Sequence, residues 1–345
     1  MMSWYVRRAM AAHRTDRWQT LSFDSEALRD NPLGDPSVRP LHVYVPEDDS
    51  RRYPSVYVIQ GMTGTADMWF NVEPWTESYP DRIATLAPEA VVVLVDAWTA
   101  VGGSQFLDSP GIGRYHTYLC DEIVPFVDAT FPTLADRAHR GIQGKSSGGY
   151  GAMITPLLRP DLFGGLATHA GDALFEACYA RDFPAAARAL RDRYDGSFEA
   201  FWDDFRSGRP VLTSHDDEVL VNTYAMAAAY SARDDGSIEL PFDPETSERV
   251  ESVWSRWLEW DPVLLARRDE HRATLRGLRA VWIDSGRRDE YYLDLGARAF
   301  HREVLASGIV PGRVRFELFD GTHRGLTWRY PLSLSFLVER LSITL

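Results

Sequence analysis

The chain has 345 residues, of which 45% are hydrophobic and 25% charged, a composition typical of a soluble globular protein with one large domain or two ordinary ones. Its formal net charge of −13 argues against nucleic acid or an anionic membrane as the main partner, because both attract cations. No run approaches the length of a transmembrane helix, and the first residues lack the apolar core of a signal peptide, so we expect a cytoplasmic protein. Cys120 and Cys178 share no metal-type spacing, so we expect two buried free thiols and no metal or other cofactor.

The first half of the chain alternates between strand-like and helix-like patterns. Short apolar runs predict strands over 18–23, 41–45, 56–59, 91–95, 139–143 and 162–168. Apolar residues at helical spacing predict helices over 118–131 and 150–158. The first two strands are expected to be antiparallel. The later alternation indicates a mostly parallel sheet with helices on both faces.

Regularity is lost between 172 and 275, a segment rich in Trp, Arg and Asp that is followed by four regular elements. Within it, helices are expected over 183–194, 197–205 and 222–231. No Pro/Gly/Ser-rich linker separates the segment from its surroundings. We therefore expect 172–275 to be a helical cap inserted into one discontinuous α/β core, formed by 1–171 and 276–345. The regular elements that follow are a strand over 280–284, a helix over 291–305, a strand over 314–319 and a helix over 330–341.

The segment Gly144-Lys145-Ser146-Ser147-Gly148 joins a predicted strand to a predicted helix. Its G-x-S-x-G pattern is typical of a nucleophile elbow, in which a sharp turn exposes the serine hydroxyl. Small residues are needed two before and two after the serine, because strand and helix backbones nearly touch there. On this interpretation Ser146 is the nucleophile and the Ser147 N–H is an oxyanion donor. Taken alone, the pattern also fits a Gly/Ser-rich turn that begins a helix.

An acid and a histidine follow the last two predicted strands, where active groups of open parallel sheets gather. Serine chemistry needs an imidazole to accept the hydroxyl proton and a carboxylate to orient that imidazole. We assign His323 as the general base and acid, and Asp289 as the orienting acid. Glu290 and Asp284 remain alternatives for the acid.

Further residues are candidates from their position after strands alone, and each is equally compatible with a structural role. The candidates for substrate binding are Gln60, Trp69, Trp98, Ser104 and Gln105. His169 also follows a strand and His116 lies in a loop. We interpret both as structural or pocket residues, not as the base.

Several segments together resemble the esterase D-type esterases, the α/β-hydrolases that include S-formylglutathione hydrolases, feruloyl esterases, enterochelin esterases and antigen 85 mycolyltransferases. The similar segments are 57–61, 114–125, 144–152, 286–290 and 321–323. The resemblance implies an α/β-hydrolase fold with a Ser-Asp-His triad of Ser146, Asp289 and His323. It also implies that the Met62 N–H is the second oxyanion donor. Gln60 departs from the His or Asp that the family often has there, and the 172–275 segment is not shared in recognisable form.

The expected function is that of a serine carboxylesterase, which hydrolyses a small-molecule carboxylic ester through an acyl-enzyme on Ser146. Transfer of the acyl group to an alcohol or thiol is the alternative, and a non-catalytic binding protein is a third. The sequence leaves open the acyl and alcohol groups, the mobility of the cap and the formation of a homo-oligomer.

Overall fold

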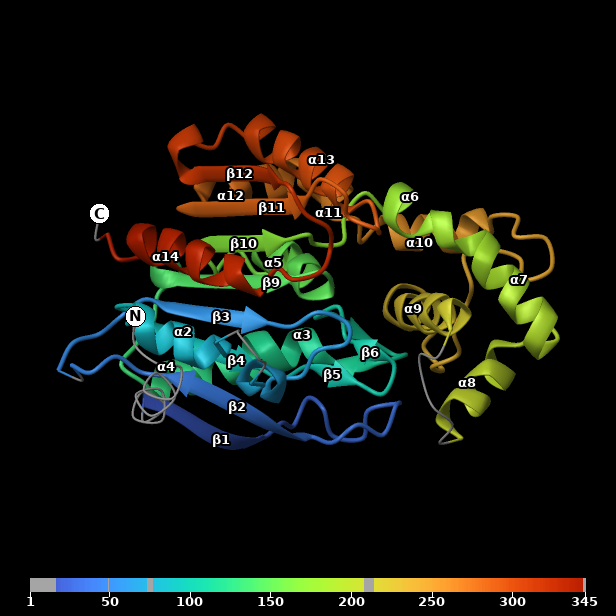
Figure 1. Cartoon of the computed structure of the whole chain (residues 1–345), viewed down its shortest axis with the longest axis horizontal. Coiled ribbons are helices and arrows are strands. Elements are labelled where there is room, and N and C mark those ends of the chain that lie inside the picture. The colour runs from blue at the N-terminus through green and yellow to red at the C-terminus, as the bar shows by residue number, and fades with distance from the viewer. Residues whose placement is uncertain (1–16, 49, 73–76, 208–213, 344–345) are drawn as a thin grey trace.

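The computed structural model describes residues 17–48, 50–72, 77–207 and 214–343 (Figure 1). An eight-stranded sheet has the strand order β1-β2-β4-β3-β9-β10-β11-β12. Strand β2 pairs antiparallel with both of its neighbours, β1 and β4, and all other pairings in the sheet are parallel. The mostly parallel sheet with an antiparallel leading pair is therefore confirmed. The strands of this sheet are β1 (Trp18–Asp24), β2 (Val38–Tyr44), β3 (Ser55–Ile59), β4 (Val91–Val95), β9 (Arg140–Lys145), β10 (Gly165–His169), β11 (Ala280–Gly286) and β12 (Val314–Phe319).

Helices cover both faces of the sheet. In β3, Tyr57 and Ile59 belong to one buried cluster and Val56 and Val58 to the other, as the two-residue period of a strand requires. Helices α2 and α14 pack on one face, and α3 to α5 and α11 to α13 on the other. The helices of the core are α2 (Tyr79–Leu86), α3 (Tyr115–Thr117), α4 (Val124–Thr130), α5 (Ser147–Leu158), α11 (Pro262–Arg267), α12 (Asp269–Gly277), α13 (Leu293–Ala306) and α14 (Tyr330–Leu341). Two small hairpins, β5 (Trp98–Thr99) with β6 (Gly102–Gly103) and β7 (Asp108–Ser109) with β8 (Gly113–Arg114), lie between β4 and α3.

The connection from β10 to β11 carries a set of helices beyond the carboxyl ends of the parallel strands (Figure 1). These helices are α6 (Phe175–Cys178), α7 (Phe183–Tyr194), α8 (Phe198–Arg206), α9 (His215–Tyr230) and α10 (Glu251–Leu258). We call residues 172–261 the helical insertion. The boundary differs from the expected residue 275, because α11 and α12 pack against α5 and α13 on the face of the sheet.

The helical insertion has an aromatic core of its own. The ring of Phe183 stacks on Phe242 at a centroid distance of 4.9 Å and meets Trp254 and Trp257 edge-on. Aromatic pairs at such distances add to the stabilisation from burial alone. The insertion is thus a packed unit and not a loose loop.

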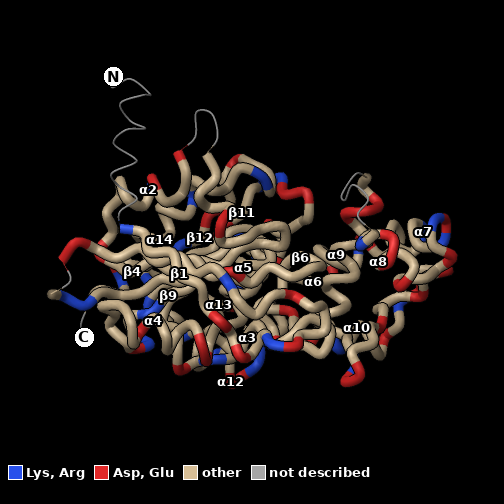
Figure 2. The backbone as a smooth tube through the Cα atoms, turned by 90° about the horizontal axis from the view of Figure 1, so that it is seen from below, with Lys and Arg blue, Asp and Glu red and all other residues tan. Residues whose placement is uncertain are grey.

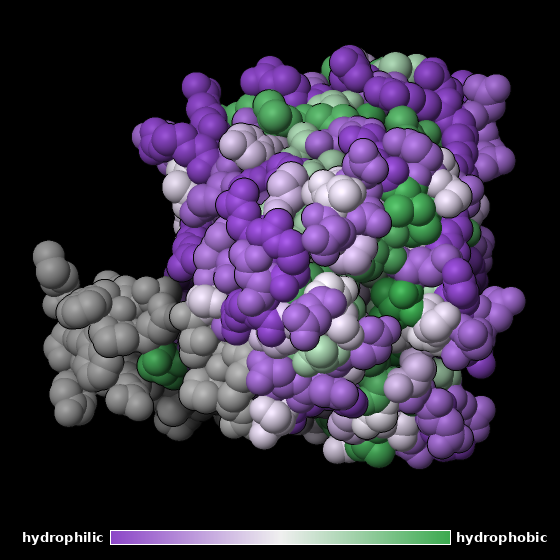
Figure 3. Space-filling view, turned by 90° about the vertical axis from the view of Figure 1, so that its right-hand side faces the viewer, coloured by the Kyte–Doolittle hydropathy of each residue, from purple (hydrophilic) through white to green (hydrophobic). Residues whose placement is uncertain are grey.

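The surface is polar and carries both signs of charge. Figure 2 shows acidic and basic residues interspersed along the chain, and Figure 3 shows a largely hydrophilic face over the helical insertion with small apolar patches. Both cysteines, Cys120 and Cys178, are buried free thiols. Among the described residues, no helix combines the length and the apolar character needed to cross a bilayer.

A single buried carboxylate joins the two ends of the helical insertion. Asp261 accepts hydrogen bonds from the backbone N–H groups of Leu174 at 3.2 Å, Phe175 at 2.8 Å and Val263 at 2.8 Å. Burial raises the pKa of Asp261, and these three hydrogen bonds oppose the increase. The start and the end of the insertion are therefore held together where the chain leaves and rejoins the core.

We expect Asp261→Ala to lower the free energy of unfolding by about 3 kcal/mol or more, because it leaves three buried N–H groups without an acceptor. Asp243→Ala is the matched control, since Asp243 accepts from Glu245 and Thr246 N–H groups in an exposed turn of the same insertion. That change should cost about 1 kcal/mol or less. Urea unfolding followed by circular dichroism measures both, and equal losses in the two variants would contradict the role given to Asp261.

Candidate active site

Ser146 occupies a strained turn between β9 and α5. Its φ is 57° and its ψ −126°, a conformation that non-glycine residues adopt at a cost. Its backbone N–H donates to the carbonyls of His169 at 3.0 Å and Ala170 at 3.1 Å, at the end of the neighbouring strand β10. These hydrogen bonds hold the turn so that Ser146 lines a pocket.

The glycines on both sides of Ser146 are required by close backbone contacts. A Cβ on Gly144 would lie 2.3 Å from the Gly148 carbonyl oxygen, and a Cβ on Gly148 would lie 2.5 Å from the Ile59 carbonyl oxygen. Both distances are far below van der Waals contact, so neither position accepts a larger residue without a backbone shift. The geometry is that of a nucleophile elbow, not of an ordinary helix-capping turn.

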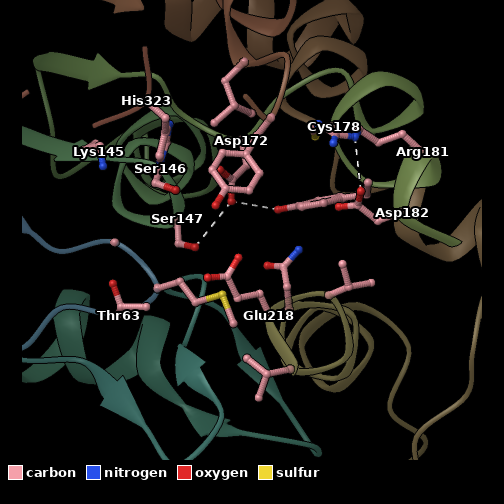
Figure 4. Close-up of a pocket in the computed structure, with 18 of the residues that line it drawn as sticks. Thr63, Lys145, Ser146, Ser147, Asp172, Cys178, Arg181, Asp182, Glu218 and His323 are labelled. Carbon is pink, nitrogen blue, oxygen red and sulfur yellow. Dashed lines mark hydrogen bonds and ion pairs between the residues drawn. The ribbon is translucent and has the colours of Figure 1, made fainter. Parts of the chain in front are cut away.

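His323 lies after β12 and is held by Asp289. The His323 Nδ1 and Asp289 Oδ2 atoms are 2.9 Å apart, and the other oxygen of Asp289 accepts from the Tyr291 N–H at 2.9 Å. Both side chains are buried. His323 and Ser146 line the same pocket (Figure 4). Within the described part of the chain, neither the Ser146 hydroxyl nor His323 Nε2 has a hydrogen-bond partner.

The other two acids that the sequence left open do not contact the imidazole of His323. Glu290 Oε2 accepts from the backbone N–H of His323 at 2.7 Å. Partial burial acts to raise the pKa of Glu290, but this hydrogen bond and others lower it overall. Asp284 lies inside β11 and pairs with His169 at 2.7 Å and with Arg329 at 2.8 Å. Among the candidates, only Asp289 is placed to orient the ring.

The loop after β3 passes directly beside Ser146. A Cβ on Gly61 would lie 3.1 Å from the Lys145 carbonyl oxygen and 3.4 Å from the Ser146 Cβ, which brings the next residue, Met62, to the nucleophile. Ser147 is the first residue of α5, where a backbone N–H has no acceptor within the helix. Met62 and Ser147 both line the pocket that Ser146 lines.

Gln60 does not line the pocket, and its side chain supports the loop through contacts with the end of β4. With the amide oriented so that both of its atoms find partners, its nitrogen donates to the Val95 carbonyl and its oxygen accepts from the Ala97 N–H at 2.7 Å. Because Val95 ends β4, the two hydrogen bonds tie the end of β3 to the end of β4. Gln60 thus supplies the support that the departure from His or Asp had left uncertain.

The pocket has a volume of about 340 Å³ and lies between the core and the helical insertion. Core residues form one side, and residues around α6 and on α9 form the other (Figure 4). The wall that the insertion contributes consists of Asp172, Cys178, Tyr179, Arg181, Asp182, His215, Glu218, Val219, Val221 and Asn222. Most of these residues carry a polar or charged group, and Val219 and Val221 add apolar surface.

Three further residues proposed for substrate binding also lie away from the pocket wall. Trp69 is buried on the opposite face of the sheet between Tyr79 and Tyr330, with centroid distances of 4.9 Å to each ring. Trp98 is exposed in the β5–β6 hairpin, and Ser104 is fully buried. A position after a strand does not fix the direction in which a loop side chain points. The side chains of Trp69, Trp98 and Ser104 all point away from the pocket.

Gln105, the fifth proposed residue, does not line the pocket but donates a hydrogen bond to Asp172, which does. The Gln105 Nε2 donates to Asp172 Oδ2 at 3.3 Å and to the Tyr230 hydroxyl at 2.9 Å, and the Tyr179 hydroxyl donates to the same Asp172 oxygen at 2.9 Å. The Ser147 hydroxyl reaches that oxygen at 3.4 Å (Figure 4). Burial raises the pKa of Asp172, against these hydrogen bonds.

Asp172 and Lys145 are pocket residues that the sequence interpretation missed. Asp172 follows the end of β10, the same kind of position that led to Asp289 and His323. Lys145 is the one lysine among the 37 lysine and arginine residues of the chain, and it directly precedes Ser146. Burial lowers the pKa of Lys145, although the nearby Asp289, Asp172 and Glu290 carboxylates oppose the decrease. The presence of a single lysine in the composition could have identified Lys145 from the sequence.

Comparison with known proteins gives one family and a common fold. The model of the family described as "Putative esterase" matches residues 36–333. A solved ferulic acid esterase is 19% identical with a TM-score of 0.57, over 93% of this chain and 97% of that one. An S-formylglutathione hydrolase from Agrobacterium tumefaciens is 17% identical with a TM-score of 0.55, over 94% and 95% of the two chains. A fluorophosphonate-binding serine hydrolase of Staphylococcus aureus is 18% identical with a TM-score of 0.54, over 93% and 98%. The expected α/β-hydrolase fold is thereby confirmed.

The lowered pKa of Lys145 can be measured directly, because reductive methylation with ¹³C-formaldehyde labels only this side chain and the N-terminal amine and keeps the charge. We expect the dimethyl-Lys145 signal to titrate at lower pH than that of dimethylated N-acetyl-lysine amide. The unfolded chain then holds this proton to higher pH than the folded chain. The free energy of unfolding should therefore rise as the pH increases between the two pKa values. A titration at or above the reference value would contradict the burial of an unpaired ammonium.

Proposed function

We propose that this chain, which belongs to the Putative esterase family of carboxylic-ester hydrolases, acts through an acyl-enzyme on Ser146. The observation that carries the proposal is the hydrogen bond of 2.9 Å between His323 and Asp289, with the opposite nitrogen of His323 left free in the pocket that Ser146 lines. A binding protein would need none of these three groups. Their arrangement beside a nucleophile elbow suits acyl transfer chemistry.

In the first half of the proposed reaction, Ser146 Oγ attacks the ester carbonyl while His323 Nε2 takes its proton. Asp289 holds Nδ1 of the same ring and stabilises the imidazolium that forms. The N–H groups of Met62 and Ser147 donate to the oxyanion, and each such donor lowers the barrier by about 3–4 kcal/mol. His323 then gives its proton to the leaving alkoxide, which departs as an alcohol.

In the second half, His323 removes a proton from a water molecule that attacks the acyl carbon. The tetrahedral intermediate again places its negative oxygen on the two N–H groups. Its collapse breaks the bond to Ser146 Oγ, and His323 returns the proton to that oxygen. The products are a carboxylic acid and the regenerated enzyme.

We expect Ser146→Ala to reduce kcat/KM on 4-nitrophenyl esters, acetate through octanoate, by about 10⁴-fold or more, because no other group can form the acyl-enzyme. Labelling by a fluorophosphonate probe should be lost as well. Ser147→Ala is the matched control, since it removes the neighbouring hydroxyl and keeps the backbone N–H. Activity that survives in Ser146→Ala would disprove the proposed nucleophile. If wild type turns over none of these esters, the loss of labelling still decides the assignment.

The acid is tested by comparing Asp289→Asn with Glu290→Gln. Asparagine at 289 keeps the shape but no longer favours the imidazole tautomer and imidazolium that the reaction needs, so kcat should fall by about 10⁴-fold. Glu290 contacts only the backbone of His323. Glu290→Gln retains an oxygen that can accept this N–H, so its kcat should fall by about tenfold or less. The reverse order of losses would assign the role to Glu290.

A further inference from the structure

Lys145 presents a cationic group in the active pocket that the proposed ester hydrolysis does not use. Its side chain lines the pocket on the same side as Ser146 and His323 (Figure 4). The described residues provide no hydrogen bond and no ion pair for its ammonium group. A partly buried ammonium without a partner is costly to retain, and every other cation of this chain is an arginine.

The carboxylates near Lys145 already have partners. Asp289 is bound to His323 and to the Tyr291 N–H, and Glu290 to the His323 N–H. Asp172 accepts from neutral donors deeper in the wall. These groups attract the ammonium through space, but none lies within ion-pair distance of it.

Arg324 adds a second free cation at the same edge. It follows His323 directly, lines the pocket, and is exposed. Among the described residues, its guanidinium group forms no ion pair. Arg324 lies close enough for its charge to act on Lys145. Two cations thus flank the Ser146–His323 side of the pocket, and neither forms an ion pair with a described residue.

We propose that Lys145, assisted by Arg324, binds a carboxylate of the substrate, so that this enzyme selects esters that carry a negative charge. The inference rests on the proposed function, because it places the carboxylate next to the ester that Ser146 attacks. A compact ammonium on a flexible stem is suited to bind a carboxylate as a point charge. Charge-assisted hydrogen bonds of this kind are about twice as strong as neutral ones.

The opposite wall fixes the orientation of such a substrate. Glu218 on α9 and Asp172 after β10 also line the pocket, and Glu218 has no ion pair within the described residues. A substrate carboxylate is repelled from these two groups and attracted to Lys145. The paired Arg181 and Asp182, whose charged atoms lie 3.2 Å apart, add no net charge to that wall. A substrate carboxylate is therefore drawn to the edge of the pocket that carries Lys145 and Arg324.

The activity test uses two pairs of esters that differ in one charge. The first pair places the carboxylate on the acyl group, as 4-nitrophenyl monoglutarate against 4-nitrophenyl pentanoate. The second places it on the leaving group, as 4-acetoxybenzoate against its methyl ester. In wild type, we expect kcat/KM to favour the anionic member of one pair by about tenfold or more.

Three variants test whether Lys145 causes the preference for the anionic ester. Lys145→Met removes the charge at similar volume and should bring the ratio within the favoured pair close to one. Lys145→Arg keeps the charge and should retain part of the preference. Arg51→Met is the control for net charge, because Arg51 pairs with Glu89 on the surface before β3, at the far end of the sheet. The proposal is overturned if wild type prefers neither anionic ester, or if Lys145→Met keeps the preference.

A binding measurement covers the case in which none of the four esters is hydrolysed. Ser146→Ala protein with ¹³C-dimethylated Lys145 is titrated with monomethyl glutarate, and separately with dimethyl glutarate as the neutral probe. We expect a saturable shift of the Lys145 signal with the monoester only, and no shift of the N-terminal signal. Equal responses to both probes, or no response to the monoester, would overturn the proposal. The proposed function is tested separately, by fluorophosphonate labelling that is present in wild type and lost in Ser146→Ala.

Discussion

The active site depends on one backbone contact, the approach of α5 to the ends of β9 and β3. Gly144 and Gly148 touch across the elbow, and Gly148 touches the Ile59 carbonyl, with no room for a Cβ at either glycine. This contact forces the turn that exposes Ser146, and it also places the Gly61–Met62 loop beside that turn. The same packing thus positions Ser146 together with Met62 and Ser147, the residues proposed as nucleophile and oxyanion donors.

Two histidine–aspartate pairs lie at neighbouring strand ends, and only the pair proposed to be catalytic lines the pocket. In the pair His169–Asp284, the second ring nitrogen of His169 lies 2.9 Å from the Ser333 hydroxyl, and Asp284 also binds Arg329. Burial acts to raise the pKa of Asp284, but His169 and Arg329 lower it overall, so the carboxylate stays ionised and engaged. This network links β10, β11 and α14 beneath the site. Among the described residues, no group hydrogen-bonds the second ring nitrogen of His323, which leaves it available for the proton transfer of the proposed function.

The sequence predicted the sheet because alternating strand and helix patterns are local properties of the chain. Ser146, Asp289 and His323 could be nominated because each follows a strand in a short segment with its own chemistry. The choice between Asp289 and Glu290 was beyond sequence reasoning, since adjacent loop carboxylates differ only in the direction they point. The same limit applied to Trp69, because the sequence did not show that its side chain packs among aromatic rings on the far face of the sheet. Lys145 was overlooked although its singular presence in an arginine-rich chain is visible without any structure.

A different helical insertion could select a different substrate while the strand-to-helix turn at Ser146 is unchanged. It rejoins the core at Asp261, whose carboxylate fixes Leu174 and Phe175, only two residues beyond the pocket carboxylate Asp172. Asp172 accepts hydrogen bonds from the Ser147 hydroxyl of the core, from Tyr179 of the insertion and from Gln105, which is held in a positive-φ conformation. Asp172 and Glu218 thus reach the pocket from the insertion, whereas Ser146, Met62 and Lys145 belong to the core. In the proposed function the reaction belongs to the core side of the pocket, and the insertion is the part of the wall that can vary with the substrate.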